Sequence, residues 1–189
     1  MSHSSKTARV LRVGIFFDGT ANNAFNTLTG QVRQAQGLRV DAGSSYAGVA
    51  TNIAKLYQCY PTQAGFDGAG RALASLYVSG IGTTTGAVDT PFPGLTYGRG
   101  RTGVLGKADQ ARAQLIECLR HFVSLDAAHP ITRVQLDIFG FSRGAAAARH
   151  FVNQVARMPF KTQFELAPDF ECVIQFVGLF DTVAAMGGL

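Results

Sequence analysis

The chain has 189 residues, 47% of them hydrophobic and only 15% charged, so it can bury the core of one domain and is not a disordered chain. Its 17 Lys and Arg residues exceed its 12 Asp and Glu residues, which gives a net charge of +5. This surplus is compatible with attraction to an anionic membrane or a nucleic acid. The basic residues form no block of five, however, so we expect mainly solvated surface and no nucleic-acid partner.

Three cysteines, Cys59, Cys118 and Cys172, lie far apart and form no CxxC pair. They predict small buried side chains, with no disulfide framework, no metal site and no cofactor. Residues 1–8 are polar and Ser-rich, and we expect a disordered tail ahead of one domain over residues 9–189. Neither a signal peptide nor an apolar run of about 18 residues occurs, so we expect synthesis in the cytoplasm and export only by a route that reads no N-terminal signal.

The first half of the chain contains two predicted strands. Residues 10–17 are apolar, β-branched and aromatic, and Asp18-Gly19 ends them. Residues 22–46 are polar and predict a loop with a short helix, and residues 52–59 predict another short helix before Pro61. A second strand is expected over residues 73–78, ended by a turn from Gly80 to Gly82.

The second half contains two longer predicted helices. Residues 80–106 hold eight glycines and two prolines, which is typical of a functional loop. Apolar residues then recur at three- and four-residue steps over 108–122 and predict a helix. A strand over 134–139, an Ala-rich helix over 143–155 and a last strand over 172–180 complete the pattern.

Apolar strands that alternate with helices predict an α/β fold, in which a mostly parallel sheet lies between two helical layers. Active sites of such sheets lie beyond the carboxyl ends of the strands. The residues expected there are Asp18 with Gly19 and Thr20, the turn from Gly80 to Gly82, Ser142 and Asp181.

The sequence Gly140-Phe141-Ser142-Arg143-Gly144 fits G-x-S-x-G between a predicted strand and a predicted helix, as a nucleophile elbow requires. Ser142 is therefore the predicted nucleophile. The backbone N–H of Arg143 is the first expected oxyanion donor, and the backbone at Gly19 and Thr20 is the second. The alternative is a Gly-rich turn that carries a serine without catalysing anything.

A nucleophilic serine needs a base, and the base needs an orienting carboxylate. Asp181 follows the last predicted strand and is our candidate acid, the alternative being an aspartate that caps the following residues. Asp18 lies at the same edge, either as part of the active-site rim or as a simple turn former. Asp137 lies inside a strand and predicts a structural hydrogen bond.

No histidine present fits the role of the base. His3 lies in the tail, and His121 and His129 precede the nucleophile strand at the opposite edge of the sheet. His150 lies eight residues into the next helix, about 12 Å along its axis. Because the triad order in α/β hydrolases is Ser, then Asp or Glu, then His, we expect the base beyond Leu189, with the C-terminal part of the fold missing.

Several segments together resemble the uncharacterised α/β-hydrolase domain of type VI secretion phospholipase effectors, the first class of those lipase effectors. The matching segments, in the order of that family, are FFDGTANN (16–23), TNIAKLY (51–57), YVSGIGT (77–83), GFSRGAAAARHFVN (140–153) and GLFDTVAA (178–185). They spread over nearly the whole chain, and the FDGT and GFSRGA segments are far more specific than G-x-S-x-G alone. In the resemblance, Ser142 matches the nucleophile and Asp181 the acid.

The resemblance implies lipase or phospholipase A activity on bacterial membrane lipids. It also implies delivery by the secretion apparatus into the periplasm of a rival cell, and a cognate immunity protein. The 189-residue chain itself is expected to be inactive, since it lacks the family's histidine. The alternative from another functional class is a catalytically incomplete remnant or adaptor that keeps the fold to bind a secretion or immunity partner.

Overall fold

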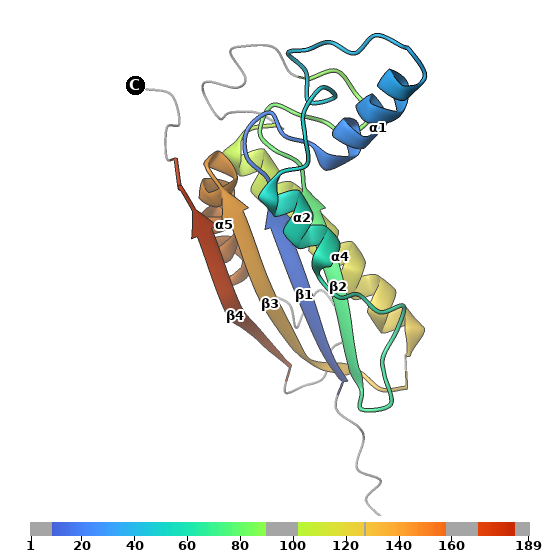
Figure 1. Ribbon diagram of the computed structural model, residues 1–189. Helices are drawn as coiled ribbons and strands as arrows, with labels where there is room; N and C mark the ends of the chain where they lie inside the picture. Colours follow the sequence, from blue (N-terminus) through green and yellow to red (C-terminus); the bar gives the residue numbers. More distant parts are fainter. Residues whose placement is uncertain (1–8, 90–101, 127, 158–169, 184–189) are drawn as a thin grey trace, which may run out of the picture.

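The computed structural model describes residues 9–89, 102–126, 128–157 and 170–183. In this part the chain forms one four-stranded sheet in which every neighbouring pair is parallel. The strands lie in the order β2 (Arg71–Val78), β1 (Arg9–Phe17), β3 (Ile131–Phe141) and β4 (Glu171–Phe180) (Figure 1). The predicted disordered tail, residues 1–8, lies outside the described residues.

Strand β1 is central because its backbone bonds both β2 and β3. Phe17 pairs with Val78 on one side and with Gly140 on the other, so the three strands end level with one another. Leu11, Val13 and Ile15 are fully buried, as expected for a strand covered on both faces. All four predicted strands are confirmed, each longer than predicted because its polar ends also join the ladder.

Helices cover both faces of the sheet, which confirms the three-layer α/β architecture. Helices α4 (Val104–Leu125) and α5 (Arg143–Val155) pack together on one face, where they bury the larger apolar core. Helix α2 (Asn52–Cys59) covers β1 and β2 on the other face (Figure 1). Only Ala, Gly or another small residue allows close helix–sheet approach, and Ala145, Ala147 and Ala148 of α5 are fully buried.

Helix α1 (Ala24–Ala35) lies beyond the carboxyl ends of the strands and is longer than the short helix predicted there (Figure 1). Its start is fixed by Asn23, whose side chain accepts hydrogen bonds from the backbone N–H groups of Phe25 and Asn26. The prediction of three buried cysteines is wrong for Cys59, which is exposed at the end of α2. Cys118 and Cys172 are partly buried, and burial raises the pKa of each thiol to about 11.

The α2 face is unevenly covered. Phe16 of β1 lies under Tyr57 and Tyr60, whereas the aromatic side chains Phe141, Phe176 and Phe180 of β3 and β4 are exposed by two fifths or more. No helix in the described part of the chain combines the length and the apolarity that crossing a bilayer needs.

Candidate functional site

The carboxyl edge of the sheet brings together the four segments that follow the strands. The backbone N–H of Asp18 donates to Val78 at 3.0 Å, and that of Gly80 donates to Asn22 at 2.7 Å, which joins the segments after β1 and β2. Likewise the backbone N–H of Ser142 donates to the carbonyl of Phe180 at 2.9 Å, and the backbone N–H of Val183 donates to the carbonyl of Ser142 at 3.3 Å. The segments after β3 and β4 are therefore held against each other at Ser142.

Ser142 is the single residue between β3 and α5. Its backbone has φ 56° and ψ −128°, a conformation that L residues rarely adopt and that costs about 1–3 kcal/mol. Although Ser142 is the N-cap of α5, its side chain forms no cap hydrogen bond. Its hydroxyl therefore does not serve the helix, and the turn holds it at the edge of the sheet.

Glycines allow the turn at Ser142 to pack directly on the segment after β1. A Cβ atom on Gly144 would lie 2.2 Å from the carbonyl oxygen of Asp18, and one on Gly80 would lie 1.8 Å from that of Gly19. Gly140 is equally enclosed, since its Cβ would approach Cα of Ala145 to 2.7 Å. The segments after β1, β2 and β3 thus touch through backbone atoms, with no side chain between them.

Asp18 holds the segment after β1 in place through the hydrogen bonds of its buried carboxylate. It is 2% exposed, and its carboxylate accepts hydrogen bonds from the hydroxyls of Tyr77 at 2.6 Å and Thr51 at 2.8 Å and from the N–H of Gly19 at 2.7 Å. Burial raises the pKa of Asp18, and the three donors oppose this shift. Tyr77 also accepts from the N–H of Ala24, and Thr51 caps α2, so one carboxylate connects the starts of α1 and α2 to the end of β1.

Gly19 and Thr20 follow Asp18 beside the serine turn. A Cβ atom on Gly19 would lie 2.9 Å from the Phe141 ring, so this backbone borders the residue before Ser142. The Thr20 hydroxyl is buried and has no hydrogen-bond partner among the described residues. Buried hydroxyls are nearly always paired in native proteins, so this one is a candidate contact for a bound group or water beside the serine turn.

Asp181 comes directly after β4 and has a positive φ of 45°. It is exposed, and its backbone position is set by the two hydrogen bonds that join Phe180 and Val183 to Ser142. The structure therefore places Ser142 and Asp181 next to each other at the edge, each directly after one of two adjacent parallel strands. Asp137, in contrast, lies within the sheet and accepts hydrogen bonds from Arg12 at 2.6 and 3.1 Å and from Tyr60 at 2.6 Å, which confirms its structural role.

The described histidines lie away from Ser142. His129 precedes β3 at the opposite edge, where its Nδ1 lies 3.0 Å from a carboxylate oxygen of Asp126. His121 lies near the C-terminal end of α4, and His150 lies two turns into α5. Among residues 9–89, 102–126, 128–157 and 170–183, no group of three His, Cys, Asp or Glu side chains could hold a metal ion.

Two hollows open at this edge, one on each side of the segment after β1. The smaller, about 290 Å³, lies at Phe141 and Phe180 and is also bordered by Ile53 and Leu56 of α2. The larger, about 800 Å³, lies between the turn after β2 and the first turns of α4. It contains Lys107, a buried lysine that sequence reasoning missed because it falls on the apolar face of a helix without any motif around it.

Two solved structures are similar to this chain. One is the Tle1 effector bound to the VgrG spike from the type 6 secretion system, with 31% identity and a TM-score of 0.62 over 96% of this chain and 39% of that chain. The other is an uncharacterized protein from Pseudomonas aeruginosa, with 21% identity and a TM-score of 0.51 over 97% of this chain and 31% of that one, a likeness that concerns the fold alone. The chain therefore spans less than two fifths of either. No protein-family model matches the sequence, and no curated protein does.

Proposed function

We propose that the chain is part of a serine hydrolase of the type VI secretion lipase effectors and that Ser142 is its nucleophile. The observation that carries this proposal is the strained turn at Ser142, which presents a hydroxyl at the carboxyl edge of a parallel sheet. The other support is the 31% identity to the Tle1 effector over nearly the whole chain. A strain of this kind persists only where the surrounding structure enforces it, and such residues cluster at active sites.

In the proposed reaction the Ser142 oxygen attacks the carbonyl carbon of an acyl ester while a base takes its proton. The tetrahedral oxyanion is stabilised by the N–H of Arg143 at the start of α5 and by the backbone N–H of Thr20. The N–H of Gly19, the other expected donor, already donates to the carboxylate of Asp18. The ester C–O bond then breaks, and the alcohol leaves with the proton that the base returns. Water releases the acyl group from Ser142 by the same steps in a second half-reaction.

Asp181 is the proposed carboxylate that orients the base, since it follows the strand next to Ser142. Because His121, His129 and His150 lie away from the turn, the base is proposed to be a histidine outside the described residues. On this account residues 9–183 alone do not hydrolyse esters. Asp18, Gly80 and Gly82 border the site without taking part in proton transfer.

The proposed substrate is a phospholipid acyl ester at a membrane surface. The apolar hollow at Phe141 and Phe180 lies beside Ser142 and fits the first part of an acyl chain. By analogy with the Tle1 effector, which was seen bound to the VgrG spike, a spike of the secretion apparatus is a proposed partner. An immunity protein and delivery into the periplasm of a target cell complete the proposal.

The decisive experiment replaces Ser142 by Ala in the full-length protein and measures release of fatty acid from phospholipid micelles. Losing the nucleophile of a triad removes about 10⁴–10⁶ of kcat, so activity should fall to background. The matched control is Ser124→Ala, since Ser124 is an exposed serine of α4 whose hydroxyl bonds only its own helix. Near wild-type turnover by the Ser142→Ala protein would show that the turn is structural and would favour a binding role for the fold.

A further inference from the structure

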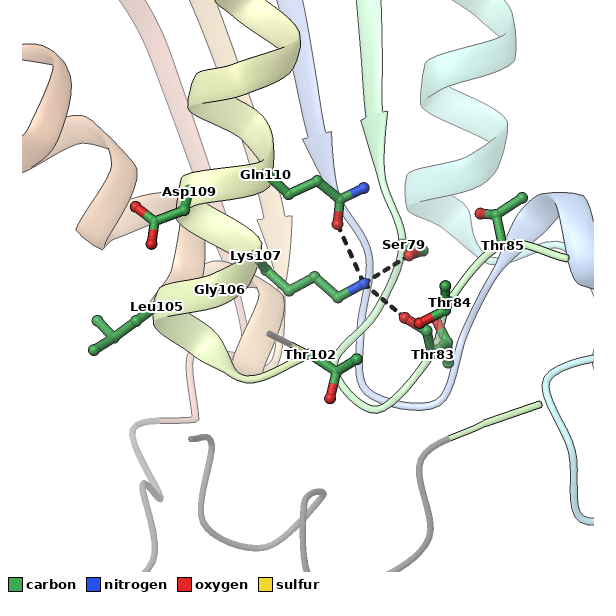
Figure 2. A pocket seen from close by; sticks show the side chains of 10 residues that line it. All are labelled: Ser79, Thr83, Thr84, Thr85, Thr102, Leu105, Gly106, Lys107, Asp109 and Gln110. Carbon is green, nitrogen blue, oxygen red and sulfur yellow. Dashed lines mark hydrogen bonds between the residues drawn. The ribbon is translucent and has the colours of Figure 1, made fainter. Parts of the chain in front are cut away.

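The hollow between β2 and α4 is a cavity around one lysine, with several hydroxyl residues among its lining. Its walls are the segment after β2 and the first two turns of α4, and hydroxyl groups line much of it (Figure 2). The side chain of Lys107 crosses from the helix to the opposite wall, where its Nζ donates to Oγ of Ser79 at 2.7 Å and to the carbonyl of Thr83 at 2.8 Å (Figure 2). The hydroxyl residues are Ser79, Thr83, Thr84, Thr85 and Thr102.

The charge of Lys107 has no counter-ion within the described residues. The residue is 3% exposed, and its three acceptors, Ser79, Thr83 and Gln110, are all neutral. Asp109 is the one acidic residue on the cavity wall, and its carboxylate points away and accepts from Gln154 at 2.9 Å (Figure 2). Burial without a nearby negative charge lowers the pKa of Lys107 to about 8, so the side chain is still mostly charged at neutral pH. Buried charges are normally paired, and this one has no acidic partner in the part of the chain that the structure describes.

One of the three N–H groups of Lys107 makes only a weak hydrogen bond. The distance from Nζ to Oε1 of Gln110 is 3.4 Å, near the limit of a hydrogen bond, whereas the other two bonds are short. A ligand oxygen in the cavity can accept a hydrogen bond from this third N–H in place of Gln110, without breaking the bonds to Ser79 and Thr83. The first turn of α4 adds to the attraction, because its N-cap is Gly103, which has no side chain to bond the N–H groups at this positive end of the helix dipole.

We propose that this cavity binds the phosphate group of the lipid substrate, with Lys107 as its charged donor. This inference rests on the proposed function for where the ester of the lipid lies. The binding of an anion in the cavity does not depend on the proposed function. Ser142 follows β3 and the cavity adjoins the end of β2, so two strand spacings, about 10 Å, separate them along the edge. The phosphate of a glycerophospholipid lies a few bonds from its acyl esters, which suits this separation. The apolar hollow at Phe141 and Phe180 lies on the other side, toward the acyl chain.

The kinetic test compares wild type and Lys107→Met in the full-length protein on two substrates with equal acyl chains. One is a phospholipid in mixed micelles, and the other is an uncharged acyl ester without phosphate. Losing a charged donor to the phosphate should lower kcat/KM for the phospholipid by roughly 10- to 100-fold. Turnover of the uncharged ester should change less than about 2-fold. An equal loss on both substrates would show that Lys107 only supports the fold and would overturn the proposal.

A second pair of variants covers the case in which Lys107→Met fails to fold. Thr84 lines the cavity but is exposed, so its side chain can be changed without disturbing the core. Thr84→Glu places a negative charge at the cavity and should lower phospholipid hydrolysis selectively, and several-fold more than Thr84→Gln, which matches glutamate in size but is uncharged. Equal phospholipid rates for the two variants would contradict an anion site.

A binding test separates failure of this inference from failure of the proposed function. Inorganic phosphate at millimolar concentration should raise the melting temperature of the wild-type protein above that in chloride of equal ionic strength, and should not do so for Thr84→Glu. If the wild type hydrolyses neither substrate but phosphate still stabilises it, the anion site stands and the hydrolase proposal fails. If phosphate has no effect and the substrate preference is unchanged by the variants, the anion site is wrong.

Discussion

The carboxyl edge of the sheet divides into two halves that differ in chemistry. The half at β3 and β4 is apolar around Ser142, with Phe141 42% and Phe180 48% exposed above the first turn of α2. The half at β2 and α4 is lined by hydroxyls around Lys107. The backbone of the segment after β1 separates them. A ligand that spans this edge would therefore meet an apolar hollow at one end and a lysine cavity at the other, and a phospholipid has an apolar end and an anionic end.

The two halves also differ in what holds them. The serine turn is held by backbone contact through Gly144 and Gly80, where no side-chain atom can be added. The lysine cavity is held by side-chain hydrogen bonds that bridge a helix and a turn. Changes in the first half should therefore damage both fold and turnover, while changes in the second can act on one substrate class and spare the fold.

Among changes that leave Ser142 in place, the largest effect on both stability and turnover is expected from Gly144→Ala. The new Cβ would lie 2.2 Å from the backbone carbonyl of Asp18, so α5 and the end of β1 must move apart. Overpacking of this kind costs about 1–3 kcal/mol, and a displacement near 1 Å of the serine turn can lower turnover by about 10²-fold. Thermal melts of the full-length protein measure the loss of stability, and its ester hydrolysis measures the loss of turnover. The control is Gly68→Ala, where no atom lies within 4 Å, and equal behaviour of the two variants would contradict the backbone packing.

The half of the edge around Ser142 was largely predictable from the sequence, whereas the half around Lys107 was not. Ser142 was found because an elbow is local, with strand, serine, glycines and helix within some twenty residues. The four strands were found for the same reason, each being one apolar run. Lys107 bonds residues 24 and 28 positions away, and the three partners of Asp18 come from β2, α2 and the next residue. Such contacts depend on how elements far apart in the sequence pack together, and the spacing of residues along the chain does not indicate that packing.

A smaller effect is expected from Asp18→Asn, which tests whether this carboxylate positions the segment beside Ser142. Asparagine has one acceptor oxygen in place of two, so either the two hydroxyls at Oδ2 or the N–H of Gly19 at Oδ1 face an NH2 group and lose their acceptor. An unpaired buried group costs about 1–3 kcal/mol, and we expect kcat to fall about 10-fold with little change in KM.

The matched control for Asp18 is Asp137→Asn, because Asp137 is also 2% exposed and bonded to a tyrosine but lies within the sheet away from the edge. It should lower the melting temperature by a similar amount and leave kcat nearly unchanged. If both variants lose kcat in proportion to their loss of stability, Asp18 has no positioning role distinct from its role in the fold.

The smallest expected effect is the pH dependence that Lys107 contributes to stability. Burial lowers the pKa of Lys107 from 10.5 to about 8, so between these values the unfolded chain binds a proton that the folded chain has lost. Stability therefore rises with pH in this window, by about 1 kcal/mol between pH 7 and pH 9. Cys118 and Cys172, whose raised pKa values act in the opposite direction from about pH 8 upward, contribute equally to both proteins compared. Urea unfolding of wild type and Lys107→Met at pH 7 and pH 9 measures how steeply the free energy of unfolding of each protein changes with pH.

Bound phosphate stabilises the charged form of Lys107, so in phosphate the free energy of unfolding of the wild type should change less with pH. A wild-type slope equal to that of Lys107→Met in chloride would mean that Lys107 is not held as an unpaired buried charge.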